Sequence, residues 1–171
     1  MTQGKQGDTR TIVSMQNENG TGVLHMDDVY DTDIDDLWSA LTKPDRLARW
    51  IVRVDGDLGV GGDFEANFVS GWEGRGTVDV CEPPRRLLVT TTQDGGTVTT
   101  IEAQLSADGE RTRLIIEERG TLISELAAHG AGWQAHIEDL VAYLDGRPTS
   151  DWETRWHELS PVYEELATDL G

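Results

Sequence analysis

Residues 34–50 read IDDLWSALTKPDRLARW, and this stretch carries the clearest folding signal in the chain. Its apolar side chains are spaced i, i+3, i+4 and i+7, which places them on one helical face: Ile34, Leu37, Trp38 and Leu41. Thr32 and Asp33 precede that face as N-cap candidates. Lys43-Pro44 ends this helix and begins a second, short one, because proline fits the first turn of a helix but not its interior. The stretch therefore predicts two consecutive short helices, with Trp38 and Leu41 in the core.

Upstream of these helices the sequence predicts a β-hairpin. Residues 11–15 and 23–30 have the apolar character of strands, and Asn19-Gly20 lies between them. Both turn residues accept the positive φ angles of a tight hairpin turn.

Downstream of the helices, between residues 51 and 119, the apolar period changes to two, as in strands. Three groups of apolar side chains are each expected to share one strand face: Phe64, Ala66 and Phe68; Val78 and Val80; and Ile101, Ala103 and Leu105. Apolar runs at 87–89 and 114–116 continue the series. Turn signals separate these segments at 59–62, Pro83-Pro84, Asp94-Gly95-Gly96 and Asp108-Gly109. Closely spaced strands with short turns predict an antiparallel meander.

Helical spacing returns after Gly120. One apolar stripe predicts a long helix that ends near Asp145-Gly146: Trp133, Ile137, Leu140, Val141 and Leu144. A second stripe follows an expected capping box at 150–153 and contains Trp152, Trp156, Leu159, Tyr163 and Leu166. Pro161 interrupts this stripe, which predicts two short helices, with Ser160 capping the second.

This order of elements predicts an α+β fold in which a curved antiparallel β-sheet wraps around a long C-terminal helix. One helix is too narrow to fill the concave face of such a sheet, so we expect a cavity between them. We assign residues 1–146 to the main domain, with a hairpin arm at 1–22, and residues 147–171 to a helical tail. The apolar stripe of the tail predicts packing on the same domain or on a dimer partner.

Charge and cysteine content restrict the partners and the compartment. The 171 residues include 14 Lys and Arg against 32 Asp and Glu, for a net charge of −18, which repels nucleic acids and anionic membranes. A single cysteine, Cys81, allows no intrachain disulfide. Residues 1–10 lack the apolar core of a signal peptide, and no apolar run approaches the roughly 20 residues of a membrane span. We therefore expect a cytoplasmic protein.

Four segments, in chain order, resemble landmarks of the START-like (SRPBCC) helix-grip superfamily, and in particular its branch of activator of heat shock protein ATPase homologues. They are Leu37–Pro44 with Leu47–Trp50, Gly59–Phe64, Gly76–Leu87, and Gly132-Trp133 at the expected start of the long helix. The resemblance covers about residues 23–146. It implies a helix-grip fold with a cavity under the C-terminal helix. Members of the superfamily include small-molecule carriers, co-chaperones, and polyketide cyclases and aromatases.

Aromatic side chains form the main candidate binding site. Phe64, Phe68 and Trp72 share strand parity and would face the helix that carries Trp133. The predicted ligand-binding residues are Trp50, Phe64, Phe68, Trp72, Trp133 and Ile137. They would line an apolar pocket for a small apolar or aromatic molecule, and the competing interpretation is that they fill an ordinary core.

We expect this binding to be noncatalytic and to need no cofactor. A chaperone-interaction module, implied by the resemblance alone, is one alternative. A cyclase-like or hydrolytic enzyme with Glu65, Asp79 or His136 as acid–base groups is another. No nucleophile elbow, phosphate loop or dinucleotide fingerprint occurs in the sequence.

The sequence also predicts no metal site. His129 and His136 are seven residues apart, whereas two zinc ligands on one helix are typically four apart, so we expect surface or cavity-rim histidines. The acidic run at 27–36 lacks the glycine and glutamate positions of an EF-hand loop.

Overall fold

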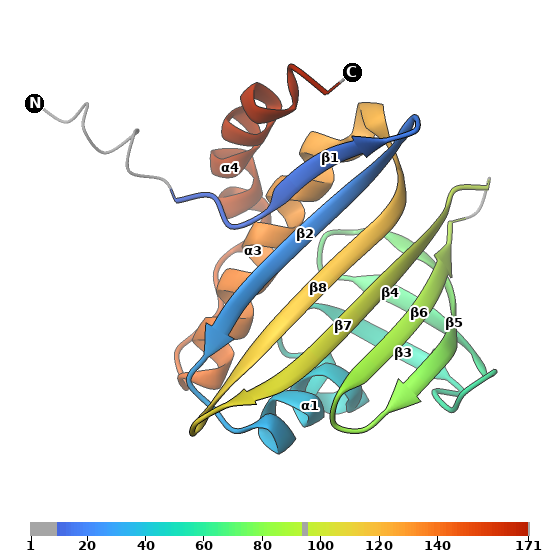
Figure 1. Ribbon diagram of the computed structural model, residues 1–171, viewed down its shortest axis with the longest axis vertical. Helices are drawn as coiled ribbons and strands as arrows, with labels where there is room; N and C mark the ends of the chain where they lie inside the picture. Colours follow the sequence, from blue (N-terminus) through green and yellow to red (C-terminus); the bar gives the residue numbers. More distant parts are fainter. Residues whose placement is uncertain (1–9, 94–95, 171) are drawn as a thin grey trace, which may run out of the picture.

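The computed structural model of the protein describes residues 10–93 and 96–170 (Figure 1). The start of the predicted arm, 1–9, and Asp94-Gly95 of a predicted turn lie outside these residues. In chain order the elements are β1 (Ser14–Glu18), β2 (Thr21–Tyr30), α1 (Ile34–Thr42), α2 (Pro44–Leu47), β3 (Val52–Gly56), β4 (Asp63–Phe68), β5 (Glu73–Glu82), β6 (Arg86–Thr92), β7 (Val98–Asp108), β8 (Arg111–Leu122), the 3-10 turn η2 (Ile123–Glu125), α3 (Leu126–Leu144) and α4 (Trp152–Ala167).

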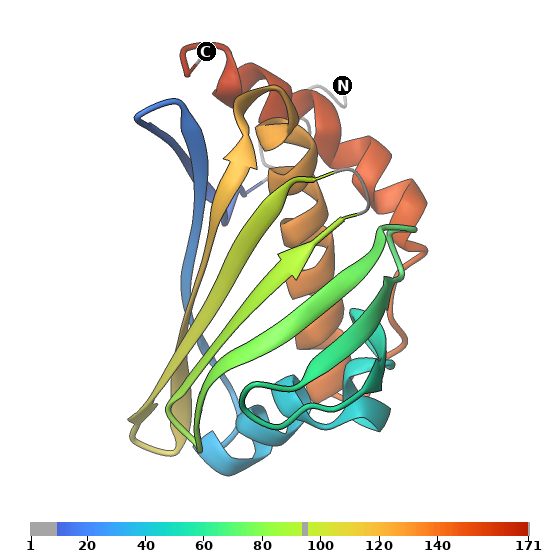
Figure 2. The same cartoon turned by 90° about the vertical axis from the view of Figure 1, so that its right-hand side faces the viewer.

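The eight strands form one curved antiparallel sheet in the order β1-β2-β8-β7-β6-β5-β4-β3. Figure 2 shows α3 lying in the concave face of this sheet, with α1 and α2 at one end and α4 at the other. The predicted α+β helix-grip architecture, including the two short helices after the first long strand, is confirmed. No helix within the described residues is long and apolar enough to cross a bilayer.

The N-terminal hairpin turns at Asn19-Gly20 as predicted, with φ angles of 55° and 92°. Its first strand, however, begins at Ser14 and not at residue 11. The backbone N–H groups of Ile12 and Val13 donate to the Tyr163 hydroxyl, at 3.2 Å each, and are therefore not available for pairing in a sheet.

Helix α1 follows the prediction closely. Asp33 caps it by accepting a hydrogen bond from the backbone N–H of Asp36 at 2.8 Å, and Leu37 and Leu41 are buried. Trp38 is only half-buried and packs at the margin of the core, so its predicted place as a core residue is wrong. Its neighbour Leu37 takes that place and is completely buried.

Strand β5 contains a bulge that the alternation in the sequence does not reveal. Val78 pairs with Val89 and Val80 pairs with Leu88, so the register shifts by one residue between them. Val78 and Val80 therefore point to opposite faces, and the prediction that they share a face is wrong. Cys81, not Val80, packs against the core beyond the bulge.

The C-terminal helices differ from the prediction in three details. Helix α3 begins at Leu126, before Gly132-Trp133, and α4 is one continuous helix that contains Pro161. Proline leaves the carbonyl of His157 without its helical donor, and His157 is exposed, so water can take that place. Ser160 does not cap a second helix, because its hydroxyl donates to the Trp156 carbonyl at 2.7 Å within the same helix.

The predicted capping box at 150–153 is also wrong. Asp151 is the N-cap residue of α4 without a side-chain cap bond. The amide and hydroxyl of Ser150 instead donate to the Asp139 carboxylate on α3, at 2.8 and 2.9 Å. Ser150 thus fixes the chain that leads into α4 against α3.

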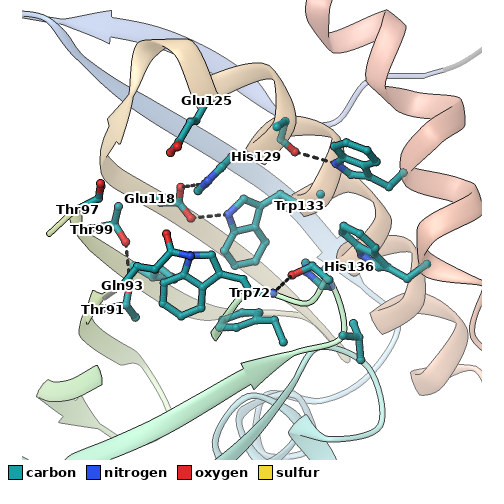
Figure 3. A pocket seen from close by; sticks show the side chains of 18 of the residues that line it. Trp72, Thr91, Gln93, Thr97, Thr99, Glu118, Glu125, His129, Trp133 and His136 are labelled. Carbon is teal, nitrogen blue, oxygen red and sulfur yellow. Dashed lines mark hydrogen bonds and ion pairs between the residues drawn. The ribbon is translucent and has the colours of Figure 1, made fainter. Parts of the chain in front are cut away.

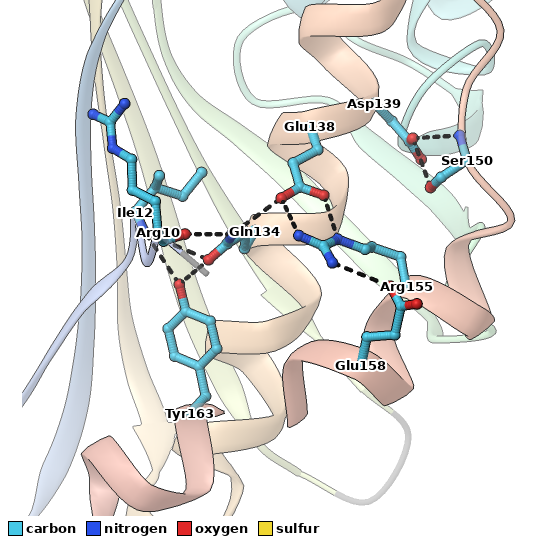
Figure 4. Close-up of polar contacts among 9 residues, drawn as sticks. All are labelled: Arg10, Ile12, Gln134, Glu138, Asp139, Ser150, Arg155, Glu158 and Tyr163. Carbon is cyan, nitrogen blue, oxygen red and sulfur yellow. Dashed lines mark hydrogen bonds and ion pairs between the residues drawn. The ribbon is translucent and has the colours of Figure 1, made fainter. Parts of the chain in front are cut away.

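Polar contacts and one buried tyrosine hold α4 against α3 of the same chain (Figure 4). Arg155 donates two hydrogen bonds to the Glu138 carboxylate, at 2.7 and 2.9 Å. The completely buried Tyr163 donates to the Gln134 side chain, and Gln134 also donates to the Arg10 carbonyl at 2.8 Å. The tail is therefore packed along the main domain. The dimer alternative stays a prediction.

Candidate functional site

A cleft of about 600 Å³ lies between the concave face of the sheet, the N-terminal half of α3 and the start of α4 (Figure 3). Both helices, the end of β4 and the loop between β4 and β5 contribute aromatic rings to its walls: Phe68, Trp72, Trp133, Trp152 and Trp156. The sheet contributes mostly polar side chains to the opposite wall, among them Thr91, Gln93, Thr99 and Glu118. The arrangement is a largely apolar cleft with a few polar groups, as small-ligand sites usually are.

Three of the six predicted binding residues line this cleft, namely Phe68, Trp72 and Trp133. The other three do not line it: Trp50, Phe64 and Ile137 are 2%, 9% and 3% exposed and belong to the closed core.

Local contacts explain why Trp50 and Phe64 lie in the core and not in the lining of the cleft. The Trp50 indole donates to the Ala40 carbonyl of α1 at 3.0 Å, which fixes its ring under that helix. Phe64 lies directly over Gly76 on the neighbouring strand, where a Cβ atom would come within 2.3 Å of its ring. Phe64 thus fills the space that glycine leaves and closes the core there.

The aromatic rings of the cleft contact one another through His136. Phe68 and Trp72 pack edge to face, with ring centroids 5.3 Å apart. The His136 ring lies 6.1 Å from the Trp133 ring and 5.2 Å from the Trp152 ring. Trp152 in turn stacks on Trp156 at 6.2 Å. A continuous aromatic surface therefore runs from the sheet to α4.

A buried carboxylate, Glu118 of β8, lies in the wall of the cleft with its side chain 6% exposed. It accepts hydrogen bonds from the Thr121 hydroxyl at 2.6 Å, from His129 Nδ1 at 2.7 Å and from Trp133 Nε1 at 2.9 Å. Burial by itself raises the pKa of Glu118, but the bond and charge of His129 and the other two bonds outweigh it and lower that pKa overall. These contacts favour an ionised Glu118.

His129 is the charged partner of this carboxylate. Burial lowers the pKa of His129, but the hydrogen bond and the negative charge of Glu118, with a further contribution from Glu125, raise it overall. The pair is therefore stabilised as carboxylate and imidazolium, which satisfies the buried charge of Glu118 within the wall.

His136, two helical turns further along α3, has the opposite character. Burial lowers its pKa to about 3, against the opposing effects of the Glu118 charge and the Trp50 main chain, so the ring is neutral at neutral pH. Within the described part of the chain, nothing hydrogen-bonds to Nδ1 of His136 or to the buried Nε1 of Trp152. Both residues line the cleft, and unpaired buried polar atoms are unusual in folded proteins.

The three proposed acid–base residues are not brought together. Glu65 is exposed on β4 beside the core-facing Phe64 and Ala66, and Asp79 is exposed at the β5 bulge, where it accepts a hydrogen bond from Thr90. Only His136 lines the cleft.

Several cleft residues were not predicted as site residues, and some of them left a signal in the sequence. Glu118 continues the period-two series of Leu114 and Ile116, which places a carboxylate on the core-facing side of a strand. His129 matches the expectation of a cavity-rim histidine. Trp152 and Trp156 were assigned to tail packing, and nothing in the sequence shows that α4 reaches the cleft.

The sequence profile of the family described as Activator of Hsp90 ATPase homolog 1-like protein matches residues 31–145. No curated protein gives a significant match.

Solved structures with the same fold include CalU16, DynU16 and an Hsp90 activator. CalU16 from Micromonospora echinospora is 27% identical with a TM-score of 0.76, and the alignment covers 95% of this chain and 99% of CalU16. DynU16, from the dynemicin biosynthetic locus, is 28% identical with a TM-score of 0.68, over 75% of this chain and 50% of DynU16.

The third comparison shows the shared fold alone. PFC0360w, an HSP90 activator from Plasmodium falciparum, is 17% identical with a TM-score of 0.61, over 75% of this chain and 99% of PFC0360w. The fold and the profile match confirm the resemblance to the START-like superfamily. Since the profile spans more than half of the sequence, the chain belongs to the family of Activator of Hsp90 ATPase homolog 1-like proteins.

Proposed function

We propose that the protein binds a small apolar or aromatic molecule, without catalysis, in the cleft between the sheet, α3 and α4. The observation that carries this proposal is the aromatic cleft of about 600 Å³. Its volume lies within the range of roughly 300–1,000 Å³ that is typical of small-molecule sites.

The exposure of the aromatic side chains supports a binding role. Phe68, Trp72, Trp152 and Trp156 are all half-buried, although they lie on the inner side of the fold. Apolar surface left in water costs roughly 25 cal/mol per Å², so a ligand that covers these rings gains binding free energy. A filled core would leave no such surface to cover.

Two observations favour binding over catalysis. Three side-chain donors already occupy the Glu118 carboxylate, which leaves it a structural charge partner rather than a free base. The acid–base residues suggested by the sequence lie apart.

One structural relative, DynU16, belongs to the dynemicin biosynthetic locus, a setting in which a small-molecule ligand is expected.

A chaperone contact is the second candidate function. For both candidate functions we propose that the protein acts in the cytoplasm. The family description refers to an Hsp90 ATPase activator, and the net charge of −18 would complement a basic surface on a partner. A contact of that kind does not need the aromatic rings inside the cleft, and this difference makes the two candidates separable.

Energy transfer from tryptophan to 1-pyrenemethanol, a neutral aromatic probe, tests the proposal. We expect a saturable one-to-one titration, weakened at least fivefold by Trp72→Ala in the cleft. Trp38→Ala is the matched control, because Trp38 is also half-buried but lies outside the cleft lining. A titration that does not saturate, or equal weakening by both variants, would contradict small-molecule binding in the cleft and favour the chaperone contact.

A further inference from the structure

We propose that the cleft selects aromatic ligands that carry a protonated amine over neutral or anionic ligands of the same shape. This inference rests on the proposed function and names the class of ligand. It is carried by the distribution of charge around the cleft and by the aromatic rings beside it.

The charges that line the cleft are predominantly negative. Three glutamates line it, namely Glu118, Glu125 and Glu153, and among the described residues no lysine or arginine does. His129 neutralises Glu118 through their hydrogen bond. The remaining two carboxylates therefore determine the net charge that a ligand meets.

Glu125 and Glu153 are both exposed, and they come from different elements that border the cleft, η2 and α4. The negative charge of Glu125 contributes to the raised pKa of His129, so its field reaches into the wall of the cleft. Glu153 is 81% exposed, and among the described basic side chains only that of His157 lies within 4 Å of its carboxylate, at 3.8 Å. An ammonium group in the cleft would be attracted by both negative charges, and beside either exposed carboxylate it would remain partly hydrated.

The arginines near the cleft residues in sequence do not offset this charge. Arg119, next to Glu118, is exposed and is paired with Glu18 and Glu117. Arg53 and Arg75 are exposed, and each alternates along its strand with core-facing neighbours, so both point away from the concave face. Neither lines the cleft. A carboxylate or phosphate on the ligand would therefore lose its hydration without gaining a cationic partner.

The aromatic walls favour a cation for a separate reason. The face of an indole ring carries partial negative charge and attracts ammonium groups. Trp156 stacks on Trp152 and is half-buried, and Glu153 lies one helical turn away on the same helix. Ring faces and carboxylates thus act together at the α4 side of the cleft.

His136, a buried residue of the cleft lining, is uncharged. His136 is 5% exposed and neutral, and its Nδ1 has no partner among the described residues. Its ring therefore adds no positive charge to the cleft, and the choice of net charge is made by Glu125 and Glu153.

Three pyrene probes of similar shape test the inference: 1-pyrenemethylamine, 1-pyrenemethanol and 1-pyreneacetic acid. We expect the amine to bind at least fivefold more tightly than the alcohol at pH 7, and the acid to bind more weakly than both. In the double variant Glu125→Gln/Glu153→Gln, the ratio of amine to alcohol affinity should fall below two.

Glu110→Gln is the control for the overall charge of the protein, since Glu110 lies in the β7–β8 turn at the end of the sheet beside α1 (Figure 1). We expect it to preserve the ratio. Equal affinity for amine and alcohol in the unmodified protein, or an equal fall of the ratio in both sets of variants, would overturn the inference but not the proposed function. If none of the three probes saturates, the proposed function itself fails.

Discussion

The two halves of α3 lie on the same sheet but differ in their surroundings: one is part of the closed core and the other lines the cleft. The C-terminal half buries Ile137 and Leu140 in a closed core beside α1 and α2, whereas His129 and Trp133 of the N-terminal half, with His136 just past the midpoint, line the cleft. The difference comes from what covers the concave face at each end. Two short helices fill one end, and at the other end α4 lies across the rim and leaves a space. We expect mutations at the closed end to change stability and mutations at the open end to change binding.

The largest expected effect is at the closed end, where Trp50→Ala should lower the free energy of unfolding by about 3–5 kcal/mol. The substitution creates a cavity and removes the donor to the Ala40 carbonyl. Urea denaturation measures the loss. At the open end Trp72→Ala should cost less than half as much, because Trp72 is already half-buried.

Probe binding provides the second half of this test. Trp50→Ala should leave the affinity for 1-pyrenemethanol unchanged as long as the variant is folded, since Trp50 does not line the cleft. If Trp50→Ala and Trp72→Ala changed stability and affinity in the same proportion, the division of α3 into a closed and an open half would be wrong.

The next effect concerns the pH dependence of stability, where the two histidines of the open half act in opposite directions. An unfolded chain protonates histidine near pH 6.5, but the folded protein keeps His136 neutral down to a pKa of about 3. Acidification from pH 6.5 to 5 should therefore cost about 2 kcal/mol from this residue alone. His129, whose pKa is raised, contributes stability that is complete below pH 6.5 and is lost as the pH rises through its folded pKa.

Denaturation of His136→Phe between pH 5 and 7 checks this expectation. The variant should lose most of the acid destabilisation, while His157→Gln, at an exposed position of α4, should keep it. An unchanged slope in His136→Phe would show that His136 is protonated in the folded protein.

The sequence predicted the closed end of the molecule better than the open end, for physical reasons. Helical spacing, proline positions and strand alternation predict the elements and their order, because each depends on neighbouring residues. The same local logic failed at Asp79, where the β5 bulge exchanges the faces of Val78 and Val80. It also failed at Pro161, where α4 continues through a proline because its tertiary contacts to α3 outweigh the lost hydrogen bond.

The candidate site was only half predictable. Strand parity placed Phe68 and Trp72 on one face, toward the helix that carries Trp133, but it could not distinguish them from Phe64, which shares that parity and ends in the closed core. That distinction depends on which helix covers each position. Trp50 lies in the turn before β3 and has no strand parity. The contribution of Trp152 depends on the path of the chain after Gly146, which no local pattern encodes.

A smaller effect is expected where α4 is attached to α3. Tyr163→Phe should lower stability by about 1–2 kcal/mol, because the buried N–H of Val13 loses its acceptor and the Ile12 N–H keeps only the longer bond to Gln134 Oε1, at 3.4 Å. Tyr143→Phe is a matched control, since its hydroxyl accepts only from the Arg46 side chain in a half-buried setting. Urea denaturation should show the larger loss for Tyr163→Phe. Equal losses would mean that the tail is not fixed by this hydroxyl.

The smallest expected effect separates two glycines that lie two residues apart in the open half of α3. A methyl group at Gly132 would lie 3.4 Å from the Trp152 ring, an ordinary contact, whereas at Gly130 it would lie 2.8 Å from the Tyr163 ring. Alanine favours a helix over glycine by up to about 1 kcal/mol, so Gly132→Ala should raise stability by about 0.5–1 kcal/mol. Gly130→Ala gains the same propensity but must displace a ring that its hydroxyl holds in place, so it should lower stability. Thermal denaturation of both variants compares them directly. Equal stabilisation by both variants would show that α4 can shift away from α3 at either position, and that the packing of α4 on the open half of α3 is not rigid.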